Sequence, residues 1–174
     1  MFKLKGILLV LIFSVFFLQG CDDEREKSSV PSSIEQDIKH TRDEASSFAD
    51  FEDKLVAQGF VKINSTSQNK LGDDVTFNYS LFRKANLNYV HIEFTGGTST
   101  KDNLTIGFDT EETTDPTIIC SDGLSSPTDF YHLEASNGLD KQWVGIYFES
   151  KQSDKTPNGE IVLNSDNGTW RGHF

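Results

Sequence analysis

Apolar residues near the start of the folded part recur at the spacing of an amphipathic helix. The positions with this spacing are Ile34, Ile38, Ala45, Phe48, Phe51 and Leu55. Ser32 and Glu35 form a capping box at the beginning of this stretch, and Gly59 is a natural stop at its end. The pattern predicts a helix over residues 33–58, whose second half packs on a core.

From Phe60 onward, apolar residues alternate with polar ones, which is the pattern of half-buried strands. The clearest alternating stretches are Val75–Leu81, Val90–Phe94, Leu104–Phe108 and Val144–Phe148. Shorter candidate strands are Phe60–Asn64, Thr117–Cys120, Phe130–Leu133, Gly159–Asn164 and Thr169–Phe174. Turn signals such as Gly72-Asp73, Gly96-Gly97 and Asn137-Gly138 separate these stretches.

The spacing of the turn signals, roughly ten residues, favours antiparallel hairpins over helical crossovers. We therefore predict a single α+β domain over residues 32–174. In this domain an N-terminal amphipathic helix packs on a mostly antiparallel, meandering sheet of about eight strands. The sheet is expected either to curl into a partial barrel or to split into a sandwich.

Four aromatic residues occupy positions opposite the apolar face of their strands: Phe82, Tyr89, Trp143 and Tyr147. Aromatic side chains on the wet face of a sheet are typical of binding surfaces, so these four form a candidate binding face. The alternative is that this face is covered by the helix or by a second sheet. The two interpretations compete for the same residues, because the helix needs a sheet face on which to dock.

Composition and charge narrow the classes of function. The chain has 16 Lys and Arg residues against 27 Asp and Glu residues, a net charge of −11. Binding of nucleic acid is disfavoured, because neutralising phosphates needs clustered basic residues. With two cysteines and four scattered histidines, a cysteine-rich zinc module is also excluded.

Residues 1–20 have the pattern of an export signal. Lys3 and Lys5 form a basic start, and an uncharged apolar run follows from residue 6 to residue 18. A permanent transmembrane helix needs about 20 apolar residues, so this run is too short to be one. The segment therefore predicts a signal peptide that is removed from the mature protein.

The run ends with residues 18–21, Leu-Gln-Gly-Cys, which resemble the lipobox of bacterial lipoproteins. That motif has a leucine at −3, a small residue at −1 and an invariant cysteine at the cleavage point; the glutamine at −2 is tolerated. In this family the cysteine sulfur receives a diacylglycerol and the freed amine is often acylated, with palmitate-type chains. The resemblance implies that Cys21 is lipidated. The residues that follow are charged and contain serines, so we expect residues 21–31 to form a flexible acidic tether. Two or three such chains hold a protein on a membrane essentially permanently.

The acidic residues after the cysteine, Asp22-Asp23-Glu24, bear on location in the cell envelope. In enterobacterial lipoproteins an Asp directly after the cysteine resembles the signal that retains the protein at the inner membrane. That resemblance implies the periplasmic face of the inner membrane. The alternative is the outer membrane or the cell surface, which an acidic cluster accompanies in other Gram-negative lineages.

The sequence contains no Gly-x-Ser-x-Gly, no phosphate-binding glycine loop and no His-Glu-x-x-His. We therefore predict a protein that is not an enzyme, with no catalytic residue, no metal and no cofactor. His91 and Glu93 lie two residues apart in one strand and are expected to face solvent. Cys120 ends an apolar run and is expected to be a buried structural thiol.

These observations favour a membrane-anchored envelope lipoprotein whose domain is a non-enzymatic protein-interaction module, of the inhibitor, immunity or accessory type. The acidic domain favours an envelope protein partner with a basic surface, because charge steers the encounter. The alternative is a binder of a small apolar ligand, with the sheet lining a cavity. The first interpretation rests on a resemblance of format alone.

Overall fold

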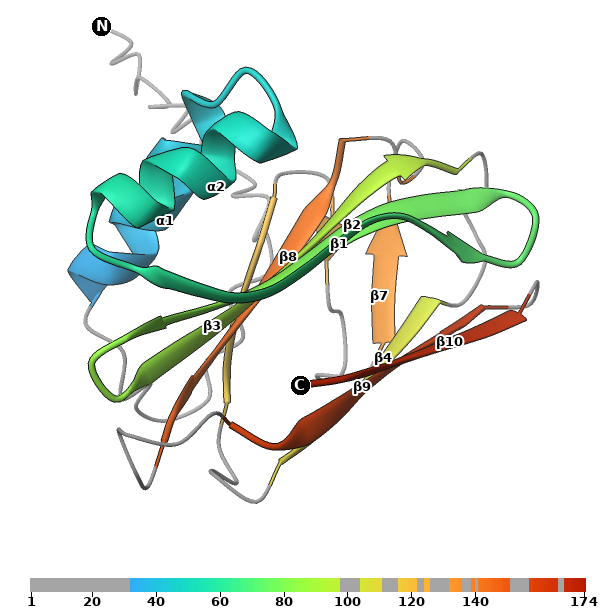
Figure 1. Ribbon diagram of the computed structural model, residues 1–174. Coiled ribbons are helices and arrows are strands. Elements are labelled where there is room, and N and C mark those ends of the chain that lie inside the picture. The colour runs from blue at the N-terminus through green and yellow to red at the C-terminus, as the bar shows by residue number, and fades with distance from the viewer. Residues whose placement is uncertain are drawn as a thin grey trace, which may run out of the picture.

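The computed structural model describes residues 32–97, 104–110, 116–121, 124–125, 132–135, 139, 141–150, 157–165 and 168–174. Within these residues the chain forms two helices and ten strands (Figure 1). The predicted signal peptide, Cys21 and the tether lie outside the described residues.

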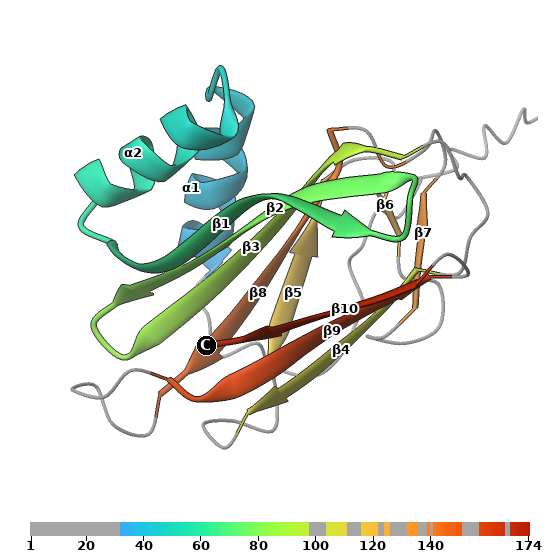
Figure 2. The same cartoon turned by 45° about the vertical axis from the view of Figure 1, so that its right-hand side comes forward.

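The strands form two five-stranded sheets in which each recorded pairing is antiparallel. The first sheet runs in the order β1 (Val61–Leu71), β2 (Val75–Lys84), β3 (Leu87–Gly96), β8 (Trp143–Glu149) and β5 (Thr117–Cys120). The second runs in the order β10 (Gly168–His173), β9 (Gly159–Ser165), β4 (Leu104–Thr110), β7 (His132–Ala135) and β6 (Leu124–Ser125). The two sheets lie face to face and do not close into a barrel (Figure 2). This confirms the predicted antiparallel architecture in its split form.

The main core lies between the two sheets. Phe77, Ile92 and Ile146 contribute from the first sheet and are 0% exposed. Ile106 and Leu163 face them from the second sheet and are 2% and 0% exposed. These residues belong to the alternating stretches of the sequence, so the period of two correctly predicted which side chains would form this core.

A second core lies between the helices and the outer face of the first sheet (Figures 1 and 2). Ile38 of α1 (Ser32–Asp43) and Phe51 and Leu55 of α2 (Phe48–Ala57) are buried there. The first sheet is therefore covered on both faces. As a result, eight consecutive residues at the start of β3 are buried, polar ones included.

The predicted single helix over residues 33–58 is wrong, because the structure has two helices with a break between them. The Ser47 side chain accepts a hydrogen bond from the backbone N–H of Asp50, which caps the start of α2. The Asp50 carboxylate in return accepts from the backbone N–H of Ser46 at 2.8 Å. Such a reciprocal cap begins a new helix and interrupts the old one. Neither α1 nor α2 has the length and apolar character needed to cross a membrane.

Candidate functional site

The four aromatic residues of the predicted binding face lie inside the molecule. Phe82, Tyr89 and Tyr147 are 0% exposed and Trp143 is 4% exposed. They belong to the core beneath the helices, where the rings of Tyr89 and Tyr147 stack at a centroid distance of 4.5 Å. The expected exposure of this face is therefore wrong. The structure has the alternative that the sequence left open, in which the helices cover it.

A chain of polar side chains crosses this second core. The Tyr89 hydroxyl lies 2.7 Å from His91 Nδ1, and His91 Nε2 lies 3.3 Å from Glu93 Oε2. Arg42 of α1 donates twice to Glu93, from Nε to Oε2 at 2.6 Å and from Nη2 to Oε1 at 2.5 Å. His91 is 0% exposed and Glu93 is 5% exposed, so the prediction that they face solvent is wrong. The helix layer turns the outer face of β3 into an interior.

Burial and charge set the protonation of this polar chain. Burial lowers the pKa of His91, against the opposing effect of Glu93. Burial raises the pKa of Glu93, but hydrogen bonds and charge from His91 and Arg42 outweigh burial and hold that pKa below its ordinary value. At neutral pH we infer a neutral imidazole beside an ionised carboxylate. Because that carboxylate only accepts, His91 carries its proton on Nε2 and accepts from Tyr89 through Nδ1.

A second buried carboxylate attaches α2 to the first sheet. Glu52 accepts from Ser65 Oγ at 2.7 Å, from Lys62 Nζ at 3.0 Å and from Ser80 Oγ. Burial raises the pKa of Glu52, and these hydrogen bonds together lower it below the ordinary value. Each helix thus contacts the sheet through one ion pair that includes a largely buried carboxylate.

We predict that acid destabilises the protein in two ranges of pH. The pKa of His91 is lowered on folding, so the unfolded chain binds more protons below the ordinary value of 6.5 and stability falls as pH falls. The lowered pKa values of Glu93 and Glu52 act in the same direction below 4.5. Urea unfolding at a series of pH values from roughly 3 to 8 measures this dependence.

The variant His91→Gln should remove much of the loss of stability between neutral pH and roughly pH 5. The matched control is His40→Gln, because the His40 side chain is 72% exposed and pairs with Glu44 on the surface of α1. An unchanged pH dependence in His91→Gln would show that the buried imidazole is not its cause.

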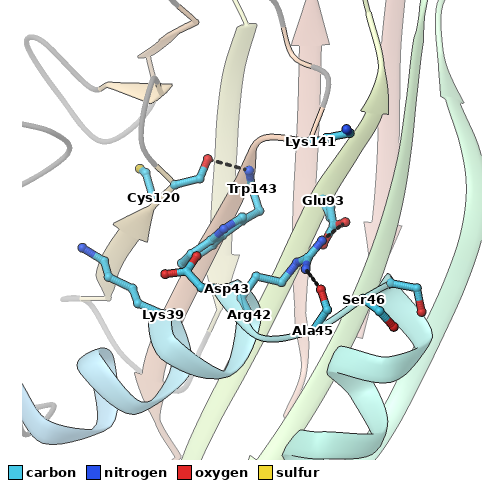
Figure 3. A pocket seen from close by; sticks show the side chains of 11 residues that line it. Lys39, Arg42, Asp43, Ala45, Ser46, Glu93, Cys120, Lys141 and Trp143 are labelled. Carbon is cyan, nitrogen blue, oxygen red and sulfur yellow. Dashed lines mark hydrogen bonds and ion pairs between the residues drawn. The ribbon is translucent and has the colours of Figure 1, made fainter.

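Beside the polar chain, a pocket of about 600 Å³ opens between the helices and the first sheet (Figure 3). It is lined by residues from α1, from the connection between α1 and α2, from β3 and from the neighbourhood of β5 and β8. These residues are Lys39, Arg42, Asp43, Ala45, Ser46, Ser47, Glu93, Cys120, Ser121, Lys141 and Trp143. Of the aromatic residues expected at a binding site, the pocket includes Trp143 alone among the described residues.

The charges around the pocket are unevenly paired. Arg42 is engaged with Glu93, whereas Lys39 and Lys141 form no ion pair within the described part of the chain. Three cationic side chains and two carboxylates line the pocket, a small positive excess on a chain with a net charge of −11. Sequence reasoning missed all three cations. Lys39 and Arg42 look like ordinary solvated residues of α1, and Lys141 lies far from them in the chain, so no local signal joins it to them.

Cys120, which lines the same pocket, differs from expectation. It is buried as predicted, but it is disulfide-bonded, so the prediction of a thiol is wrong. The sequence has one other cysteine, Cys21, which lies outside the described residues. A sulfur in a thioether cannot also form a disulfide, so a lipid on Cys21 and a bond from Cys21 to Cys120 exclude each other.

The described residues contain no group of three or more His, Cys, Asp or Glu side chains that could hold a metal ion. His91 and Glu93 could have been two such ligands, but Arg42 and Tyr89 occupy their polar atoms instead.

No family model matches the chain, and no curated protein matches it. Among solved structures, it is similar to the GAE domain of GGA2p from Saccharomyces cerevisiae, with a TM-score of 0.30 and 10% identity over 64% of this chain and 93% of that chain. A yeast GGA1 GAE domain gives a TM-score of 0.27 and 12% identity over 65% of this chain and 93% of that chain. With TM-scores this low, neither likeness assigns a family or a function.

Proposed function

We propose that this protein is a lipid-anchored lipoprotein of the bacterial cell envelope whose folded domain binds another envelope protein without catalysing a reaction. The observation that carries the proposal is the lipobox-like run at residues 18–21 after a basic start and an apolar stretch. Its lipid would be attached to Cys21, which requires that the disulfide of Cys120 joins it to another chain and not to Cys21. Residues 22–31 would connect the lipid to α1. On this basis the inner membrane, facing the periplasm, is the proposed location.

The arrangement of the buried titratable groups supports a role in binding rather than catalysis. His91 and Tyr89 are 0% exposed, so a substrate cannot reach them without moving the helices. Glu93 lines the pocket, but Arg42 and His91 already engage its oxygens. A general base must reach its substrate by a hydrogen bond, and these groups are committed to each other. We therefore assign them to holding α1 on the sheet.

The alternative of a small apolar ligand gains no specific support from the described residues. Between the sheets, the side chains of Phe77, Ile92 and their neighbours pack together as one buried hydrophobic core. The pocket that the structure does show is lined mainly by charged and polar residues. An apolar ligand prefers a pocket lined by hydrophobic and aromatic side chains.

The anchor is tested by growing cells that produce the chain with an alkyne-tagged fatty acid. We expect label on the wild-type protein, which should sediment with membranes, and on the matched variant Cys120→Ala. The variant Cys21→Ser should carry no label, because serine cannot accept the diacylglycerol as a thioether. Unlabelled wild-type protein in the soluble fraction, lighter than the reduced chain by two hydrogens, would show a disulfide in place of the anchor.

The same cells, treated with a crosslinker before lysis, test the interaction. Mass spectrometry of crosslinked peptides should identify one recurrent envelope protein, joined at the same positions in repeated experiments. Labelled, membrane-bound protein that reproducibly yields no crosslinked partner would leave the anchor standing and overturn the proposed binding role.

A further inference from the structure

We propose that the pocket between the helices and the first sheet is a binding site for a carboxylate group. The proposed site consists of Lys39, Arg42, Ser121, Lys141 and Trp143. The carboxylate would belong to a peptide segment of the partner, and that assignment to a partner rests on the proposed function. The chemistry of the pocket itself does not depend on it.

The walls of the pocket offer hydrogen-bond donors that the described part of the chain does not use. A guanidinium has five N–H donors, and Arg42 uses three of them, two on Glu93 and one on the Ala45 carbonyl. Ser121 Oγ accepts from the backbone N–H of Trp143 at 3.0 Å, and its O–H donates to no group among the described residues. A pocket rich in spare donors is complementary to a ligand that only accepts.

The lysines around the pocket also favour an anionic ligand. Lys39 of α1 and Lys141 before β8 lie on different sides of Trp143 (Figure 3) and bring two ammonium groups that form no ion pair with the described residues. Lys141 adopts a positive φ of 62°, uncommon for a residue with a side chain, and its N–H donates to the Phe94 carbonyl at 2.9 Å. The backbone thus holds this lysine at the rim of the pocket.

The carboxylates of Asp43 and Glu93 limit the charge of the ligand. Glu93 is paired with Arg42, so the charges that remain are the two lysines and Asp43. Their sum is a positive excess of one charge. A carboxylate carries one negative charge and matches that excess, whereas a phosphate dianion would meet repulsion from Asp43. The pocket volume of about 600 Å³ is larger than one carboxylate needs, which leaves room for apolar neighbours against Trp143 and Ala45.

The whole chain restricts the partner further. Its net charge of −11 repels a strongly acidic segment at long range. The segment that fits is therefore neutral or basic overall and presents one carboxylate beside apolar side chains. A suitable probe is the acetylated, amidated peptide Lys-Phe-Glu-Phe-Lys. Its counterpart with Gln in place of Glu removes the carboxylate alone.

Titration calorimetry of the full mature chain in detergent tests the site. We expect the Glu peptide to bind and the Gln peptide to bind at least about tenfold more weakly. A third peptide has Gln in place of Glu but a free C-terminal carboxylate, and it tests whether a terminal carboxylate also binds. Sodium acetate, added as a competitor, tests whether a small carboxylate alone occupies the site. Equal affinity for the Glu and Gln peptides, or no heat from any of them, would overturn the proposal.

Lysine variants locate the site. The pair Lys39→Gln and Lys141→Gln should weaken binding of the Glu peptide about tenfold. The matched pair Lys54→Gln and Lys70→Gln changes the net charge equally at one half-buried and one exposed lysine outside the pocket, and should change binding less than about twofold. Equal losses in both pairs would mean a general charge effect and not a site.

A crosslinked partner that is still captured by the variant with both pocket lysines replaced would keep the proposed function and reject this pocket as its contact. If the wild-type protein yields no crosslinked partner but still binds the Glu peptide, the carboxylate site stands and the proposed function is rejected.

Discussion

Replacing Glu93 by glutamine is expected to lower the free energy of unfolding by about 3 kcal/mol, because it leaves the Arg42 guanidinium without its counter-ion in a largely buried place. The Arg42 side chain is 14% exposed and that of Glu93 is 6% exposed. The loss should stay at the low end for a broken buried pair, since Arg42 keeps a path to the water of the pocket. Urea unfolding at neutral pH measures it.

The chain offers a matched control for this change in the pair of Arg171 and Glu160. It joins the same two groups at 3.0 Å, but the side chains are 59% and 30% exposed. The variant Glu160→Gln should cost between about 0 and 1 kcal/mol, because water screens an exposed pair. If Glu93→Gln and Glu160→Gln cost the same, the Arg42–Glu93 pair does not hold α1 on the sheet.

Replacing Phe51 by alanine is expected to lower the free energy of unfolding by about 3–5 kcal/mol, the range for a large buried aromatic ring. Phe51 is 0% exposed, and its ring packs edge-on against the ring of Phe82. The centroids of the Phe51 and His91 rings lie 4.4 Å apart. Its loss would open a cavity in the core beneath the helices. The loss of stability is again measured by urea unfolding.

The matched control for Phe51→Ala is Val56→Ala on the same helix. Val56 is 47% exposed, so its truncation should change the free energy of unfolding by no more than about 0.5 kcal/mol. A small effect of Phe51→Ala would contradict the packing of α2 on the first sheet. An equally large loss in both variants would show that the effect does not depend on burial of the side chain, because alanine itself favours the helix.

The two changes probe the same layer by different forces. Phe51 contributes apolar burial, and Arg42 and Glu93 contribute a paired charge across the same boundary. The cost of an unpaired buried charge makes other placements of α1 unfavourable, while burial of Phe51, Leu55 and Ile38 provides the main attraction. Stability of the helix layer therefore depends on both, and the pocket beside Arg42 depends on that layer.

The sequence correctly predicted the features that local patterns control. The alternation in Val90–Phe94 and Val144–Phe148 identified the strands and the side chains that face the second sheet, because successive residues of a strand point to opposite faces. The prediction of one continuous helix failed at the break before α2. This break could have been predicted, since Ser47 and Asp50 form a capping signal that can be read from the sequence. The apolar period continued across that signal and concealed it.

By itself, then, the sequence determined the strand pattern, the sign of the net charge and the lipobox resemblance on which the proposed anchor rests. Only the tertiary structure decided that the opposite face of the first sheet is covered, since a period of two distinguishes the two faces of a strand but not which of them is wet. Only the structure, too, joined Arg42 to Glu93 across 51 residues and placed Lys39 and Lys141 around one pocket. Contacts so distant in the chain leave no local pattern, because each residue is individually ordinary in its own segment.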